Sequence, residues 1–208
     1  MRNMAISIIA MMVLAACNQG GGAAAGGDSK AASGESAHTS SGGGDGKEII
    51  IGFSAPLTRR QSHYGEDYKS GVQMAIDEAN EQGITINGGP AKFKLDAQDD
   101  GADPKQATQV AERFVDLKVA GVIGHFNSGT TIPASKVYEE NNIPNVSMAT
   151  SPVLTQQGFK NVFRSMTSDS QQGLVLGKYA VDKLGYKTVG IIDDRTAYGQ
   201  GLADEFEK

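Results

Sequence analysis

The stretch GVIGHFNSGTT at Gly121–Thr131 decides the fold. The apolar run at residues 120–123 is typical of a short strand, and the small and polar residues after it form a loop. We expect this loop to open a helix with Pro133 in its first turn, where a missing N–H group loses no hydrogen bond. A strand, a loop and a helix in this order present backbone N–H groups at the positive end of a helix dipole, which favours an anion.

Two familiar kinds of anion or acyl site compete for this stretch. Gly124–Thr131 nearly matches the phosphate loop GxxxxGK[ST], but it lacks the lysine that reaches the phosphates. Ser128 is a candidate nucleophile with His125 nearby, but the elbow pattern G-x-S-x-G needs a glycine where Phe126 stands. The plainest alternative is a turn of a parallel sheet in which the hydroxyls of the loop serve as local caps.

Strand and helix patterns alternate on both sides of this stretch. Glu48–Phe53 and Thr188–Ile192 are continuous apolar runs, as expected of strands covered on both faces. Tyr64–Gln82 has helical periodicity, and a second helix begins after Asp103, an N-cap followed by proline. Further strands are expected at 93–97, 119–123 and 146–148, and further helices at 134–140, 168–184 and after residue 199. The pattern predicts an α/β fold, an open parallel sheet with helices on both faces and a ligand site beyond the carboxyl ends of the strands.

Charge and composition exclude several other classes of site. Asp96, Asp99, Asp100 and Asp103 cluster, but their spacing does not fit the calcium loop D-x-[DN]-x-[DN]-G. A capped helix start beside a strand end explains this cluster, so we expect no metal and no cofactor. The net charge is −5 and no basic patch stands out, which argues against nucleic acid as a partner.

The N-terminus has the pattern of an export signal. Met1–Cys17 carries one positive charge before an apolar run that is too short to span a bilayer permanently. It ends in LAAC, which resembles the bacterial lipoprotein box, and Cys17 is the single cysteine of the chain. Lipidation of Cys17 would anchor the protein to a membrane surface, and Asn18 after it weakly favours the outer membrane. Residues 18–46 lack large apolar side chains and are expected to form a disordered tether rich in Gly, Ser and Ala.

The loops at the strand ends resemble those of the leucine/isoleucine/valine-binding protein family, the periplasmic receptors of branched-chain amino acid ABC transporters. The resemblance covers about residues 48–208 and rests on several short motifs that occur in register. The motifs are Ile51-Gly52 with Pro56-Leu57, His63-Tyr64-Gly65, Asp99-Asp100-x-x-Asp103-Pro104-Lys105-Gln106-Ala107, Gly121-Val122-Ile123-Gly124-His125 with Ser128, Thr150-Ser151-Pro152-x-Leu154-Thr155, Phe163-Arg164, and Asp194 through Tyr198-Gly199-x-Gly201.

The resemblance implies a fold of periplasmic binding protein type I, in which two α/β lobes close on a ligand. It assigns residues 47–165 to the first lobe and 166–208 to the start of the second. The family chain is much longer, so the resemblance implies that this sequence is a fragment and that the acidic residue used on the ligand ammonium lies beyond it. We expect residues 48–208 alone to expose apolar sheet edges and to bind ligand weakly or not at all.

The resemblance also implies roles for individual residues. Ser128 matches the residue whose hydroxyl and N–H group hold the carboxylate of an amino acid. Thr150 matches the threonine that bridges carboxylate and ammonium, and Met148 the residue whose carbonyl accepts from the ammonium. Tyr64 and Tyr198 match tyrosines of the pocket wall, one on each lobe. These residue types suit a zwitterion with an aliphatic tail.

Three further positions are not assigned as ligand contacts. His125 is expected to pack the loop without touching a ligand. Arg59 and Arg60 stand where the family is commonly rich in glycine or proline, so they are either solvated or favour a more acidic ligand.

The function that follows is a periplasmic, lipid-anchored receptor that captures an amino acid, most simply a branched-chain one, for an ABC permease. It makes and breaks no bonds. The alternative is a sensor of the same fold that binds an amide or another small solute and signals to a regulatory partner. A hydrolase built on Ser128 and His125 is the least favoured interpretation.

Overall fold

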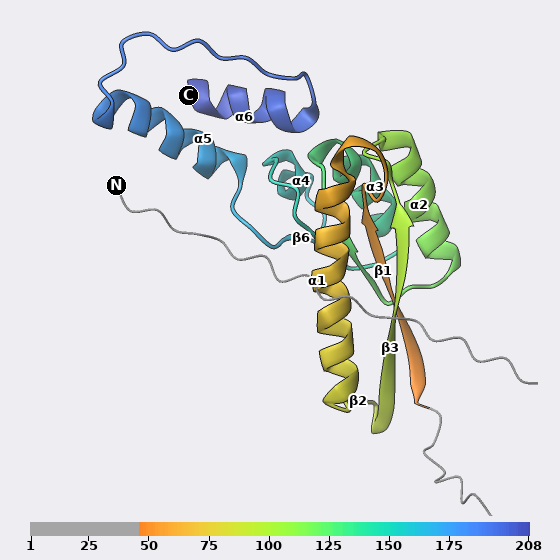
Figure 1. Cartoon of the computed structure of the whole chain (residues 1–208). Helices are drawn as coiled ribbons and strands as arrows, with labels where there is room; N and C mark the ends of the chain where they lie inside the picture. The colour runs from red at the N-terminus through yellow and green to blue at the C-terminus, as the bar shows by residue number, and fades with distance from the viewer. Residues whose placement is uncertain (1–45) are drawn as a thin grey trace, which may run out of the picture. The chain divides into compact units, whose positions relative to one another are not determined.

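The parallel sheet expected from the sequence is present in the structure. The computed structural model describes residues 46–208, which contain a six-stranded sheet in the order β2-β3-β1-β4-β5-β6 (Figure 1). All neighbouring strands are parallel except β2 and β3, which form an antiparallel hairpin around Asn87 and Gly88. The strands are β1 Lys47–Ala55, β2 Thr85–Ile86, β3 Gly89–Asp99, β4 Gly121–Gly124, β5 Asn145–Ser147 and β6 Val162–Arg164.

Helices pack on both faces of this sheet, as expected. One helix, α1, packs against β1 and β3, whereas α2 and α3 pack against each other and contact the sheet from its other side (Figure 1). The helices are α1 Ser62–Glu81, α2 Pro104–Asp116, α3 Ser128–Glu140, α4 Val153–Gln156, α5 Asp169–Lys178 and α6 Ala197–Glu207, with a 3-10 turn η1 at Arg59–Gln61 and a π-helical turn η2 at Tyr179–Lys183.

The apolar run of β1 serves two hydrophobic cores. Successive side chains of a strand point to opposite faces of its sheet. Phe53 is fully buried against α1 beside Val72 and Ile76, whereas Ile50 packs into the core that α2 and α3 form with Phe114. The strand therefore needs apolar side chains at consecutive positions, which is why the sequence shows a continuous run there.

The start of α2 confirms the expected cap. The Asp103 carboxylate accepts hydrogen bonds from the N–H groups of Lys105 and Gln106, both at 2.9 Å. Both hydrogen bonds lower the pKa of Asp103, and the bond from the backbone N–H group of Gln106 has the larger effect. The Gln106 side chain donates to the Asp99 carbonyl at 2.7 Å. Residues 46–208 contain no group of His, Cys, Asp and Glu suited to a metal ion.

The loop between β1 and α1, residues 56–61, is held at both ends. The carboxylate of Asp99 accepts from the N–H group of Leu57 at 2.8 Å and from the hydroxyl of Thr58 at 2.5 Å. At the far end, Gly65 of α1 lies so close to the carbonyl of Pro56 that a Cβ atom would overlap it. The loop is thus fixed by a strand on one side and by a helix on the other.

The helix after β4 begins earlier than expected, so the placement of Pro133 in its first turn is wrong. The Asn127 carbonyl accepts hydrogen bonds from the N–H groups of Thr130 and Thr131, and from both hydroxyls as well. These bonds start α3 at Ser128 and leave Pro133 inside the helix. Most of the expected loop is therefore the first turns of α3.

The strand expected at Thr188–Ile192 is absent from the structure. This segment is extended without pairing, and Ile192 is 98% exposed. A strand needs a neighbour for its backbone groups, and no described strand lies beside this one. The flanking helices α5 and α6 pack on each other through Gly173, where a Cβ atom would lie 2.6 Å from the backbone of Glu205.

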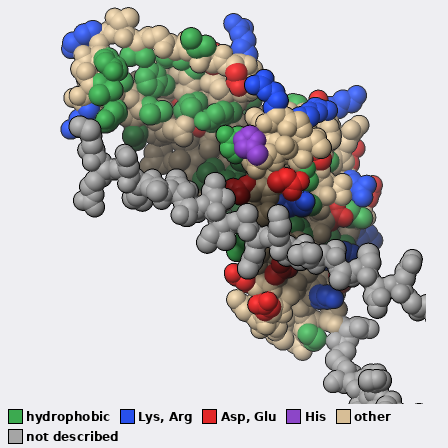
Figure 2. Space-filling view, viewed as in Figure 1, with side chains coloured by type: hydrophobic (Ala, Val, Ile, Leu, Met, Phe, Trp, Pro, Cys, Tyr) green, Lys and Arg blue, Asp and Glu red, His purple; other side chains and the backbone are tan. Residues whose placement is uncertain are grey.

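Apolar side chains gather on the surface around α5 and the segment after it (Figure 2). They include Leu174, Val175, Tyr179 and Val181, each about half exposed or more. Within residues 46–208, no helix combines the length and apolar character that crossing a bilayer requires. The expected signal peptide, the acylated Cys17 and the tether up to residue 45 lie outside the described residues.

Candidate ligand-binding site

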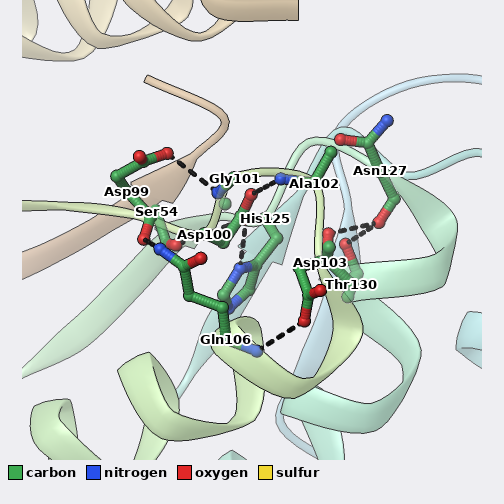
Figure 3. A network of polar contacts seen from close by, with 12 residues as sticks. Ser54, Asp99, Asp100, Gly101, Ala102, Asp103, Gln106, His125, Asn127 and Thr130 are labelled. Carbon is green, nitrogen blue, oxygen red and sulfur yellow. Dashed lines mark hydrogen bonds and ion pairs between the residues drawn. The ribbon is translucent and has the colours of Figure 1, made fainter. Parts of the chain in front are cut away.

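A buried polar network supports the loop at the end of β4 (Figure 3). Nδ1 of His125 lies 2.7 Å from Oδ2 of Asp100, and Nε2 lies 2.9 Å from the hydroxyl of Tyr138. All three side chains are 0% exposed. Burial and then the Asp100 charge raise the pKa of the Tyr138 hydroxyl, which stays protonated. With both ring nitrogens in use, His125 packs the loop and offers no base to Ser128.

Ser128 connects two neighbouring loops at the carboxyl ends of β4 and β5. It is the first residue of α3 and is 1% exposed, and its hydroxyl accepts from the N–H group of Ser151 at 3.3 Å. The N–H groups of Ser128 and Gly129 precede the first helical hydrogen bond, so they have no acceptor within the helix. The structure thus joins Ser128 to the segment that holds Met148 and Thr150.

A second serine fixes the spacing of these loops. The Ser147 hydroxyl donates to the His125 carbonyl at 2.7 Å and lies 3.2 Å from the Thr131 hydroxyl. The same oxygen accepts from the N–H group of Ala149 at 3.0 Å. The backbone around Met148 and Thr150 therefore has a defined position relative to the first turn of α3.

Asp169 is a buried carboxylate beside Thr150 whose burial the sequence did not reveal. It is 0% exposed, and its N–H group donates to the Thr150 carbonyl at 2.9 Å. Neither carboxylate oxygen accepts a hydrogen bond from the described residues, although the Thr150 hydroxyl lies nearby. Burial raises the pKa of Asp169, while Thr150 and Arg164 oppose that shift. An acidic residue in the first turn of a helix is ordinary in a sequence, so only its burial distinguishes this one.

The two tyrosines occupy different surroundings. Tyr64 is 52% exposed and stacks on Phe126, with ring centroids 5.6 Å apart and planes 12° apart. Tyr198 is 41% exposed in the first turn of α6, where its hydroxyl accepts from the Gln172 amide at 3.5 Å. Of the predicted contacts, Tyr198 lines the main cleft of the described residues. The others, Tyr64, Ser128, Met148 and Thr150, lie outside that lining.

This cleft has a volume of about 980 Å³. Its walls are the loop after β1, the turn at Gly101 and Ala102, the first turn of α3, and the segment from Asp194 to Tyr198. The first three of these follow the carboxyl ends of strands, and the fourth leads into the start of α6. In open α/β sheets, ligands bind beyond the carboxyl ends of the strands. The lining offers hydroxyls and the N–H groups at the starts of α3 and α6, a set suited to binding a small polar molecule.

Comparisons with known proteins agree with this architecture. The Leu/Ile/Val-binding protein homolog 1 of Brucella abortus is 45% identical over 162 residues, which are 77% of this chain and 43% of the relative. An amino acid binding protein of Pseudomonas aeruginosa is 43% identical over 159 residues, 76% of this chain and 42% of the relative. The branched-chain amino acid transporter substrate-binding protein of Streptococcus pneumoniae, solved with isoleucine, is 30% identical with a TM-score of 0.70, over 77% of this chain and 46% of that structure.

The chain spans less than half of the length of these relatives. The relatives are named as Leu/Ile/Val-binding, amino acid binding and transporter substrate-binding proteins, and none of these three is named as an enzyme. Residues 48–208 match the family described as periplasmic binding protein. The type I fold, the position of the site and this match lead to one conclusion: the chain belongs to the periplasmic binding protein family.

Proposed function

We propose that the protein is an extracytoplasmic receptor that captures an amino acid. The observation that carries the proposal is the contact between Ser128 and the loop holding Met148 and Thr150, beside the buried carboxylate of Asp169. A free amino acid carries one negative and one positive group. The site offers N–H donors at a helix start for the first and a carbonyl, a hydroxyl and a carboxylate for the second.

Each residue has a role in this proposal. The N–H group and hydroxyl of Ser128 hold the ligand carboxylate. The Thr150 hydroxyl bridges carboxylate and ammonium, and the Met148 carbonyl accepts from the ammonium. Tyr64 and Tyr198 flank the side chain of the ligand. We add Asp169 as an ammonium acceptor, because an unpartnered buried carboxylate gains most from a cationic partner.

Leucine, isoleucine and valine are the first ligands to test, because they occur in the names of the relatives. The chain is titrated with each amino acid by NMR, with ligand up to about 10 mM so that affinities in the millimolar range are measurable. Ser128→Ala should reduce the affinity by about tenfold or more, since it removes a hydroxyl that meets a charge. Ser135→Ala is the matched control, because Ser135 is a buried serine of the same helix whose hydroxyl donates to Ile132. Equal losses in the two variants, or no binding, would overturn the proposal.

The same proposal includes the domain organisation of the receptor, its membrane anchor and its partner. Residues 47–165 form the first ligand-binding lobe and residues 166–208 begin the second. Cys17 is acylated at the end of the signal peptide, and residues 18–46 tether the lobes to the membrane. The partner is an ABC permease that takes up the released amino acid. Incorporation of a labelled fatty acid that is lost in Cys17→Ser would support the anchor, and labelling that persists would contradict it.

A further inference from the structure

The main cleft carries an excess of positive charge that the contacts to an amino-acid backbone do not use. Among the residues that line it are Arg59, Arg60 and Arg195, against Asp194 as the one acidic lining residue. Tyr198 lines the cleft, and so does Gly129, the residue after Ser128, so the cleft adjoins the proposed amino-acid site. The arginines of the loop after β1 define what we call the basic end of the cleft, residues 59 and 60.

The acidic groups around the basic end are committed to other partners. Both oxygens of Asp99 accept from the loop, from Leu57 and Thr58. Asp103 attracts Arg59 but uses its carboxylate to cap α2. Asp194 accepts from the hydroxyl of Thr196 at 2.6 Å and from its N–H group at 2.9 Å.

As a result, the arginines lack close counterions. Within residues 46–208, no ion pair involves an arginine. Arg59 donates from Nη1 only to the Gly101 carbonyl, at a long 3.4 Å. A guanidinium group has five N–H donors in a planar fork that fits a carboxylate, and most of these donors remain available here.

The backbone holds Arg59 toward the cleft. Its φ angle of 66° lies in the left-handed region, which a residue with a side chain adopts at a cost. The bonds from Asp99 to the two preceding residues support this conformation. The guanidinium packs on Gly101, where a Cβ atom would lie 3.3 Å from Cζ of Arg59. The side chain therefore lies against the cleft wall, near the first turn of α3.

We propose that the basic end of the cleft binds an anionic side chain of the ligand, so that the receptor prefers amino acids ending in a carboxylate over their neutral isosteres. The inference rests on the proposed function, because Ser128 and Thr150 hold the amino-acid backbone while Arg59 and Arg60 meet the tail. The positive ends of α3 and α6, which both face the cleft, add to the same potential.

The test compares L-glutamate with L-glutamine, which have nearly the same shape and differ by one charge. NMR titration of the full chain should give glutamate an affinity about tenfold higher at low salt, and the preference should shrink as salt screens the charges. Arg60→Gln should reduce the preference about threefold or more. Lys92→Gln is the matched control, because it removes one exposed positive charge on β3 away from the cleft and should leave the preference unchanged.

The outcomes separate this inference from the proposed function. Binding of leucine and glutamine without a preference for glutamate would overturn the anionic subsite and leave the amino-acid receptor standing. A glutamate preference that Arg60→Gln and Lys92→Gln reduce equally would show a general charge effect and would also overturn the subsite. Failure of all three amino acids to bind would overturn both proposals.

Discussion

Removing the hydroxyl of Tyr138 tests how much the buried network under the β4 loop contributes to stability. The hydroxyl lies 2.9 Å from Nε2 of His125, and both side chains are 0% exposed. Tyr138→Phe leaves the ring nitrogen buried without a partner, which costs about 1–3 kcal/mol. For a chain of this size, about 2 kcal/mol corresponds to a fall in Tm of roughly 4–8 °C.

The assay is thermal and urea unfolding followed by circular dichroism, and Tyr68→Phe is its control. Tyr68 packs edge-on against Phe53, at a centroid distance of 5.1 Å, and burial alone raises the pKa of its hydroxyl. The same substitution there should change the free energy of unfolding by less than about 0.5 kcal/mol. If the two variants lose equal stability, the network contributes nothing specific and the reasoning is refuted.

Three further predictions follow from particular contacts. Burial raises the pKa of Asp169, so the folded state binds its proton more tightly and loses stability as the pH rises above 3.8; Asp169→Asn should raise Tm at neutral pH, lose that gain in acid and weaken amino-acid binding. An unchanged pH profile of Tm would contradict this. Gly65→Ala should destabilise α1 because a Cβ atom would overlap the Pro56 carbonyl, whereas Gly71→Ala meets nothing within 4 Å and should stabilise the helix by about 0.5–1 kcal/mol; urea midpoints of equal sign would argue against the close contact. Burial raises the pKa of Tyr68 to about 12, so stability should fall between pH 10 and pH 12 as the unfolded chain ionises first, and Tyr68→Phe should flatten that part of the curve.

Local signals in the sequence predicted much of the first part of the fold. The apolar run of β1 and the Asp103 cap of α2 each arise from residues that are close together in the sequence, and the structure confirms both predictions. The prediction that Pro133 lies in the first turn of its helix was wrong. The hydrogen bonds to the Asn127 carbonyl start α3 at Ser128, ahead of the position that the proline preference indicated. Short elements such as β2, α4 and β6 contain too few residues for a periodic pattern to appear.

Features that depend on distant residues could not be predicted. The run at Thr188–Ile192 has the composition of a strand, but a strand forms only where a neighbour supplies its hydrogen bonds. The burial of Asp169 arises from the loop that contains Thr150, which is remote in the sequence. Ser128 was identified from its motif, yet its contact with Ser151 required the two strands to be adjacent.

The anchoring of the loop after β1 separates the residues that hold it from those that meet the cleft. Leu57, Thr58 and Gly65 fix its course through Asp99 and Pro56, whereas Arg59 and Arg60 project from it and support no part of either core. We therefore expect mutation at those two positions to change the chemistry of the cleft lining while the scaffold keeps its fold. Under the proposed function, single substitutions in this loop would change the ligand specificity of the receptor without a cost to its folding.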